Sequence, residues 1–403
     1  MRKKRLFAFV RVGLGLAILA WVARSLPWSD ELSLTSADGQ KATVRGEILG
    51  DWKRHEIEFR VPPGTILPAL LEAAPWRSEA DGGRVLRVQR HAGREGPAGY
   101  EWRPGMPTAF GQMDRGGLAR AMGLFSLGML LVITRWWRLL YLASCPTSWF
   151  NAFRLTFLGM FFNLVVPGLT GGDVVKAVVV AGENPGRRAD ALVSVVVDRI
   201  LGLGVLAVIA VVVVLASGAV FEELWLPLVG GIALGVLGIF LYALKPLRRR
   251  LGLSALVDRL PFGEKLRSLD RAALVYLRHP LEMALAVAIS AANHFLIIWG
   301  VCELARAFGV TRAMVSFAQF MVLVPVANIV SALPVAPGGW GVGEATYEVL
   351  FDMVGADGAL GVATSVSFRL CSLCFGLVGG LFLLLPSYKA EIRALQEEGT
   401  AAL

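Results

Sequence analysis

Long apolar runs separated by polar loops dominate the sequence. Six of them approach or exceed the roughly 20 residues that cross a bilayer: Leu6–Ala23, Leu118–Thr134, Ala191–Val220, Leu224–Leu244, Leu281–Ala305 and Ala359–Leu385. Shorter apolar pieces lie at Phe153–Pro167, Ala313–Pro334 and Ala345–Val354. No single soluble core needs so many runs, so the pattern predicts an all-α polytopic membrane protein. An apolar content of 55% agrees with that class.

A polar segment, residues 28–117, interrupts this pattern, with 12 Lys or Arg against 13 Asp or Glu. Partial alternation predicts strands at Lys41–Leu49 and Trp52–Val61, and Arg84–His91 is typical of a third. Ile66–Ala74 is predicted as a short helix, and Gly and Pro clusters separate these pieces. We therefore expect a small α+β insertion between the first two membrane helices.

The distribution of positive charge predicts the orientation. The segment Lys245–His279 holds nine Lys or Arg against three Asp or Glu, and such loops stay in the cytoplasm. This rule accounts for the basic composition, so no nucleic acid partner is expected. Residues 1–27 fit either an uncleaved anchor or a signal peptide, and the length of the run favours the anchor. We expect a bacterial inner-membrane protein with residues 28–117 outside and both termini, including the tail 387–403, in the cytoplasm.

Several polar residues have simple explanations. The sequence Arg135-Trp136-Trp137-Arg138 fits an interfacial belt at a membrane boundary, and attraction to anionic lipid explains Lys176 in a cytoplasmic loop. For Asn293 and His294, an interhelical hydrogen bond is favoured over a proton relay. Cys371 and Cys374 lack a second ligand pair, so neither a metal nor another cofactor is expected.

Two of the shorter runs break in the same way. The first contains Asn163, Pro167, Gly171, Gly172 and Asp173, and the second contains Asn328, Pro337, Gly338, Gly339 and Glu344. A helix follows each break, with Ser194, Asp198 and Arg199 in one and Thr364, Ser367 and Arg369 in the other. By the charge argument the first break faces the cytoplasm and the second faces outside. This pattern predicts inverted repeats with broken or re-entrant helices that meet near the midplane.

The two arginines carry the predicted chemistry. An arginine within the bilayer costs at least about 2.5 kcal/mol, so a carboxylate or a substrate phosphate must offset it. The candidate site for a lipid head group therefore comprises Arg199, Arg369, Asp173, Glu344, Asp198, Asn163 and Asn328. The breaking residues Pro167, Gly171, Gly172, Pro337, Gly338 and Gly339 are expected to shape the turns. A structural ion pair that locks the two halves together is the alternative interpretation.

These motifs resemble a known family. The segment 135–140, the motifs around 163–173 and 194–199, and the segment 337–344 resemble the flippase-like family, also called the lysylphosphatidylglycerol synthase transmembrane region. The resemblance covers a helical domain at about residues 118–386 and implies movement or exposure of lipids between leaflets. In bifunctional members an aminoacyl-transferase domain follows. Only about 18 residues follow the last run here, so synthase activity is not expected.

Three functions are compatible with these features. The leading hypothesis is a non-enzymatic translocase for an anionic phospholipid or a lipid-linked sugar. The sequence contains no G-x-x-x-x-G-K-[ST] motif, so ATP hydrolysis is not expected. The second hypothesis is a membrane-embedded head-group transferase with Asp173 or Glu344 as general base. The third is a scaffold that does not transport and that binds an envelope protein partner through residues 28–117.

Overall fold

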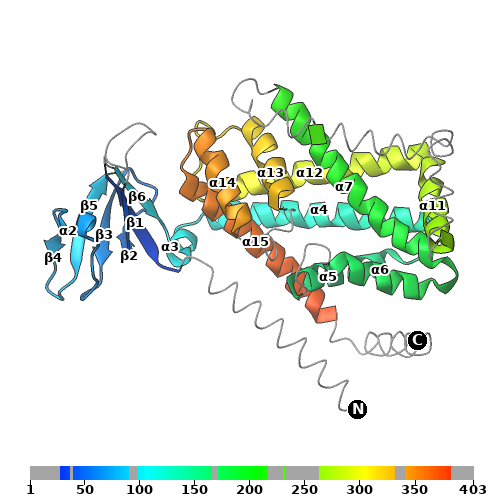
Figure 1. The fold of residues 1–403 in the computed structure, drawn as a ribbon, viewed down its shortest axis with the longest axis horizontal. Helices are drawn as coiled ribbons and strands as arrows, with labels where there is room; N and C mark the ends of the chain where they lie inside the picture. Colours follow the sequence, from blue (N-terminus) through cyan, green and yellow to red (C-terminus); the bar gives the residue numbers. More distant parts are fainter. Residues whose placement is uncertain are drawn as a thin grey trace, which may run out of the picture.

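The computed structural model describes residues 28–36, 40–89, 99–165, 171–216, 230–231, 263–331 and 341–382. Four helices in these ranges are long and apolar enough to cross a membrane: α4 (Arg115–Leu142), α7 (Arg188–Ala216), α12 (Pro280–Ala307) and α15 (Gly358–Leu381). They coincide with four of the six predicted spans. The predicted span Leu6–Ala23 lies outside the described residues, as does Leu224–Leu244 apart from residues 230–231. The described chain is therefore that of a polytopic membrane protein (Figure 1).

Before α4 the chain forms a six-stranded sheet with the order β4-β5-β3-β2-β1-β6. Its strands are β1 (Asp30–Thr35), β2 (Lys41–Leu49), β3 (Glu56–Val61), β4 (Arg77–Ser78), β5 (Arg84–Gln89) and β6 (Gly99–Arg103), with the short helix α2 (Ala69–Glu72) between β3 and β4. The described pairs are all antiparallel. The predicted strand Lys41–Leu49 is confirmed with its bounds, whereas β3 begins only at Glu56.

A buried carboxylate fastens this sheet to the next helix, α3 (Met106–Gly111). Asp30 is 3% exposed, and its two oxygens accept hydrogen bonds from the backbone N–H of Ile48 at 2.6 Å and of Gly105 at 2.5 Å. The Thr108 hydroxyl donates a third bond at 3.0 Å. Because β1, β2 and α3 meet at one side chain, the sheet has a fixed connection to the helical part.

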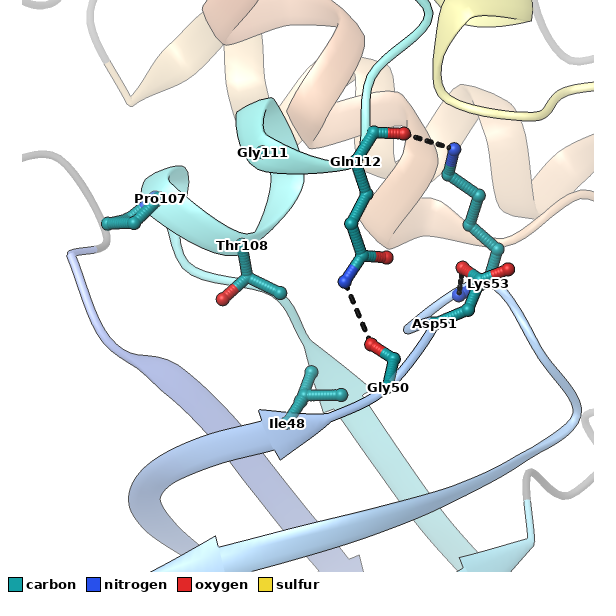
Figure 2. A pocket seen from close by; sticks show the side chains of 8 residues that line it. All are labelled: Ile48, Gly50, Asp51, Lys53, Pro107, Thr108, Gly111 and Gln112. Carbon is teal, nitrogen blue, oxygen red and sulfur yellow. Dashed lines mark hydrogen bonds between the residues drawn. The ribbon is translucent and has the colours of Figure 1, made fainter.

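A second set of bonds lies next to this clamp, around an open cavity of about 660 Å³. Figure 2 shows the Gln112 side-chain amide donating to the Gly50 carbonyl at 2.8 Å, while the Lys53 ammonium donates to the Gln112 carbonyl at 2.8 Å. The turn after β2 is thereby tied to the end of α3.

Replacing Asp30 with alanine is expected to lower the free energy of unfolding by about 2 kcal/mol, because two buried N–H groups lose their acceptor. Thermal unfolding of the full-length protein in detergent measures this. Glu31→Ala is the matched control: Glu31 pairs with Arg45 at 3.1 Å on the sheet surface, and its loss costs less than about 1 kcal/mol. Equal losses in the two variants would contradict the role of Asp30 as a clamp.

The first broken run folds as a hairpin of α5 (Trp149–Val165) and α6 (Gly171–Glu183). At one end, the Asn151 amide donates to Glu183 at 2.8 Å and Arg154 pairs with the same carboxylate at 3.3 Å. At the other end, the Asn163 side-chain oxygen accepts a bond from the Gly172 N–H at 2.7 Å. The two helices are thus antiparallel, and the end of α5 lies beside the start of α6 at the tip of the hairpin.

The second broken run has the same arrangement, with α13 (Phe317–Ser331) followed by α14 (Val342–Met353). The rings of Phe320 and Phe351 lie 6.0 Å apart, which places the start of α13 beside the end of α14. At the tip, a Cβ on Gly343 would lie 2.8 Å from the Ser331 hydroxyl. At 1.5 Å per residue, α13 is about 22 Å long and α14 about 18 Å. Both are shorter than the roughly 30 Å hydrocarbon core of a bilayer.

The two hairpins enter the helical bundle from opposite ends. Helices α4 and α12 are antiparallel, as the pairs Arg120–Glu303 and Arg138–Glu282, both at 2.8 Å, show. The Trp149 indole at the start of α5 donates to Thr134 near the end of α4. By contrast, α14 lies at the sheet end, where Glu348 pairs with Arg103 of β6 (Figure 1). Each hairpin therefore has its open end at a different end of the bundle.

The sheet and the bundle share one hydrophobic core. Leu32 and Trp52 of the sheet region belong to the same buried cluster as Phe308, Phe320 and Phe351 of the helices. At this junction Asp114 caps α4 by accepting bonds from the N–H groups of two glycines, which lowers the pKa of its carboxyl below the usual value. A second cluster surrounds Trp136 at the far end of α4.

Candidate functional site

The first hairpin carries a bidentate ion pair. Asp173 lies in the first turn of α6, where a carboxylate is favoured by the helix dipole. It meets Arg199 of α7 at 2.5 Å from Nε to Oδ2 and at 2.7 Å from Nη2 to Oδ1. The Asp173 side chain is 15% exposed, but that of Arg199 is 53% exposed. The guanidinium is therefore held by a carboxylate and still accessible.

The second hairpin carries the corresponding pair. Glu344, in the first turn of α14, meets Arg369 of α15 at 2.7 Å from Oε1 to Nε. Its other oxygen accepts a bond from the Gly341 N–H at 2.7 Å, which caps the helix. Gly341 has a φ of +82°, a conformation that favours glycine. The side chains of Arg369 and Glu344 are only 15% and 14% exposed, so this pair is covered.

The two arginines occupy matching positions. Arg199 lies eleven residues after the start of α7 at Arg188, and Arg369 lies eleven residues after the start of α15 at Gly358. Both are about 16 Å along their helices at 1.5 Å per residue. Each pair joins a hairpin to the helix that follows it. Neither pair joins the first hairpin to the second, so these two ion pairs do not form the lock that was the alternative interpretation.

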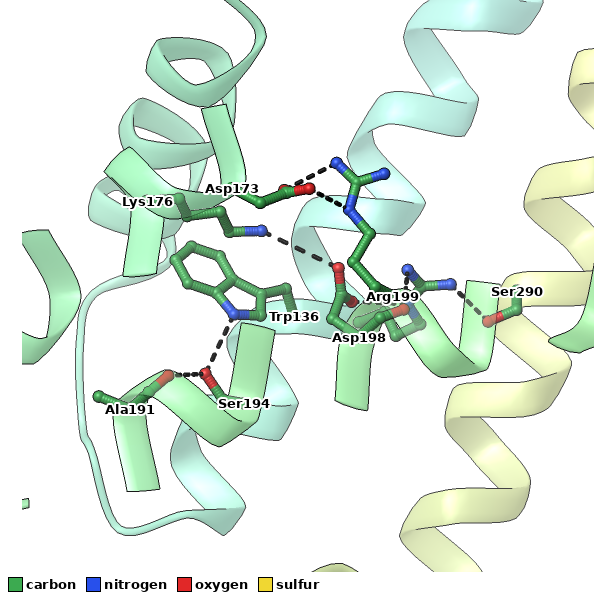
Figure 3. Close-up of polar contacts among 9 residues, drawn as sticks. Trp136, Asp173, Lys176, Ala191, Ser194, Asp198, Arg199 and Ser290 are labelled. Carbon is green, nitrogen blue, oxygen red and sulfur yellow. Dashed lines mark hydrogen bonds and ion pairs between the residues drawn. The ribbon is translucent and has the colours of Figure 1, made fainter. Parts of the chain in front are cut away.

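A cluster of charged side chains that was not predicted from the sequence is buried beside the Asp173–Arg199 pair (Figure 3). The Arg135 guanidinium donates to the Asp198 carboxylate at 2.9 Å, to the Asp198 carbonyl at 3.1 Å and to the Ser290 hydroxyl at 2.5 Å. Lys176 lies 3.9 Å from the other oxygen of Asp198 and 3.5 Å above the Trp136 ring. This group joins α4, α6, α7 and α12.

The structure corrects three expectations here. Arg135 and Trp136 do not form an interfacial belt, because α4 continues through Leu142 and turns both into its packed face. Lys176 is not in a loop, because α6 extends to Glu183, and its side chain is only 5% exposed. Asp198, expected as a free head-group ligand or a partner of Arg199, is committed to Arg135 instead. The missed signal was the apolar pair Leu139–Leu140, which extends the helical pattern beyond Thr134.

The remaining predicted residues have different positions. Asn163, a candidate head-group ligand, accepts a hydrogen bond from the Gly172 N–H at the tip of the first hairpin. Gly172 packs against the Gly159 backbone, and Asn328 is half-buried in α13. Gly171 begins α6. Four predicted turn residues lie outside the described residues: Pro167, Pro337, Gly338 and Gly339.

An interhelical hydrogen bond was expected for Asn293 and His294 of α12, and it is confirmed for His294. His294 bonds through Nε2 to the Gly202 carbonyl of α7 at 2.8 Å. The neighbouring Asn293 packs against α4, where a Cβ on Gly128 would lie 2.9 Å from its side-chain oxygen. These contacts fix α12 between α4 and α7.

Comparison with known proteins identifies the family of the helical part of the chain. Residues 105–380, from the end of β6 through α15, match the sequence model of the family described as the lysylphosphatidylglycerol synthase TM region. A UPF0104 membrane protein of Pyrococcus horikoshii is 24% identical over 286 residues, which covers 66% of this chain and 85% of that protein. No solved structure matches the chain. The chain belongs to the lysylphosphatidylglycerol synthase transmembrane region family of membrane proteins.

Proposed function

We propose that this protein binds the phosphate of an anionic phospholipid or a lipid-linked sugar and moves the head group between the two leaflets. The observation that carries the proposal is the repeated unit of a broken hairpin, an acidic residue in the first turn after the break and an arginine in the next helix. Guanidinium binds phosphate bidentately, as it binds carboxylate. A phosphate can therefore compete with Asp173 or Glu344 for the arginine.

Inverted repeats are part of this proposal. In it, α4 to α7 correspond to α12 to α15, with the two series running in opposite directions. The packing of α5 on α15 and of α13 on α7 supports this correspondence, since each hairpin lies against the last helix of the other half. The different exposure of the two arginines supports alternation: Arg199 is accessible while Arg369 is covered. In our proposal a lipid exchanges between two sites that open in turn.

The orientation is also proposed. The basic segment includes α11 (Gly263–Leu277) and ends beside the far end of α4, where the Tyr276 hydroxyl donates to the Leu139 carbonyl at 3.3 Å. The sheet lies at the other end of α4. Because basic segments stay in the cytoplasm, this arrangement supports a sheet outside a bacterial inner membrane.

Arg199→Gln and Arg369→Gln are each expected to slow the movement of labelled phosphatidylglycerol across reconstituted vesicles by about tenfold or more. Loss of a hydrogen bond to a charged group costs about 1.5–3 kcal/mol, which corresponds to that factor. Arg138→Gln is the matched control, since Arg138 pairs with Glu282 away from both tips and its loss leaves the rate unchanged.

Each outcome of this assay has a defined meaning. Rates that are unchanged in both tip variants would contradict the proposed sites. Chemical change of the lipid without movement would support a head-group transferase instead. A wild-type protein that neither moves nor modifies lipid, but co-purifies with an envelope protein through residues 28–117, would support the scaffold hypothesis.

A further inference from the structure

The charges around the first hairpin do not balance. Three cations, Lys176, Arg135 and Arg199, are linked through ion pairs to two carboxylates, Asp173 and Asp198. The described group thus carries one positive charge in excess. At the second hairpin, one arginine meets one glutamate. Because an uncompensated charge is costly within a bilayer, the excess at the first hairpin calls for an anion.

Lys176 is the cation with the weakest compensation. Its side chain is 5% exposed, yet the Asp198 oxygen nearest its ammonium is 3.9 Å away, beyond hydrogen-bonding distance. The other Asp198 oxygen is taken by Arg135 at 2.9 Å. Among the described residues no hydrogen-bond acceptor engages the ammonium, and the Trp136 face supplies only a cation–π contact at 3.5 Å. A buried ammonium with three unused donors is suited to an anionic ligand.

The surroundings of this group favour a lipid over a soluble anion. On α7 the accessible Arg199 shares a face with Val196, Ile200 and Leu203, which are 55%, 50% and 51% exposed. On α6, Val174 near the tip is 58% exposed. In a membrane these apolar side chains face acyl chains, so a head group reaches Arg199 sideways from the bilayer. Figure 3 shows the Asp173–Arg199 pair and the Lys176 ammonium on the same side of Trp136.

We propose that Lys176 and Arg199 together bind the phosphate of an anionic lipid at the start of α6, and that this is where the lipid is loaded. The inference rests on the proposed function and adds the residue that selects for a net negative head group. Trp136 and Asp198 position the ammonium, and Arg135 positions Asp198.

The test measures head-group selectivity in the full-length protein in detergent. Bound fluorescent phosphatidylglycerol is displaced by unlabelled phosphatidylglycerol, by zwitterionic phosphatidylcholine or by inorganic phosphate. Lys176→Gln is expected to weaken phosphatidylglycerol binding about tenfold with no change for phosphatidylcholine, and Lys176→Arg is expected to restore most of it. Arg187→Gln, which removes an exposed cation from the linker after α6, is the control and keeps wild-type affinities.

Four results are decisive. A selective loss in Lys176→Gln supports the site. Equal losses for both lipids, together with a lower unfolding temperature, would show a purely structural role for Lys176 and overturn the inference. Displacement by inorganic phosphate as strong as that by phosphatidylglycerol would overturn the lipid as ligand. A selective loss in a protein whose wild type moves no lipid would keep the binding site and overturn only the proposed translocation.

Discussion

Arg135→Ala is expected to lower the free energy of unfolding by about 3–5 kcal/mol, because it leaves the buried carboxylate of Asp198 without its main partner. Arg135 and Asp198 are 5% and 6% exposed, so water cannot replace the lost bonds at low cost. The remaining cation, Lys176, lies 3.9 Å from Asp198 and makes no hydrogen bond to it. The variant also removes the only described donor to Ser290 from another helix.

Thermal and denaturant unfolding in detergent measure this loss. Arg138→Ala is the matched control on the same helix. The side chains of Arg138 and its partner Glu282 are 39% and 40% exposed, so the loss of this ion pair is expected to cost about 1 kcal/mol or less. Equal costs for Arg135→Ala and Arg138→Ala would show that the cluster is not a buried ion pair in solution.

Gly172→Ala is expected to destabilise the first hairpin by about 3 kcal/mol or more. An added Cβ would overlap the carbonyl group of Gly159 and lie 2.8 Å from the Asn163 side-chain oxygen. Backbone cannot give way as a side chain does, so α5 and α6 must separate. The separation would also break the bond from the Gly172 N–H to Asn163 and shift Asp173 away from Arg199.

The control for this variant is another helical glycine in the membrane region. Gly123 of α4 has open space around its Cβ position, so Gly123→Ala is expected to be neutral or to stabilise by up to about 1 kcal/mol. Size-exclusion profiles after heating compare the two variants. A Gly172→Ala protein as stable as Gly123→Ala would mean that α5 and α6 do not approach closely at this point.

The membrane helices were predictable because each is long and apolar along its own length. The segments of α4, α7, α12 and α15 were visible in the sequence as runs. The ion pairs were less predictable. Arg199 and Asp173 were both candidates, but their pairing depends on how α6 packs against α7, which no local pattern contains.

The buried cluster was not predicted because its charged residues were expected to lie at the membrane surface or in a loop. Arg135 ends an apolar run, so the predicted span stopped at Thr134, although the helix continues to Leu142. Lys176 follows a glycine pair, which favours a loop, although α6 begins at Gly171. In both cases a charged residue lies inside because partners from two other helices contact it. Those partners are up to 155 residues away in sequence, as with Arg135 and Ser290.

The strands of the sheet also differ in how well the sequence predicts them. Strand β2 has nine residues with partial alternation and was predicted with its bounds. Strands β1 and β6 are shorter and were not predicted, because they are stabilised mainly by each other and by β2. Their register pairs Leu32 with Trp102, which are far apart in the chain. Long-range pairing of this kind has no signature within either strand.

The most direct test of the account is an experimental structure of the full-length protein in a phosphatidylglycerol bilayer. We predict density for a phosphate within hydrogen-bonding distance of the Arg199 guanidinium and the Lys176 ammonium, with acyl chains along Val196, Ile200 and Leu203. Lipid density confined to the outer surface, with the tip of the first hairpin closed against Arg199, would contradict it.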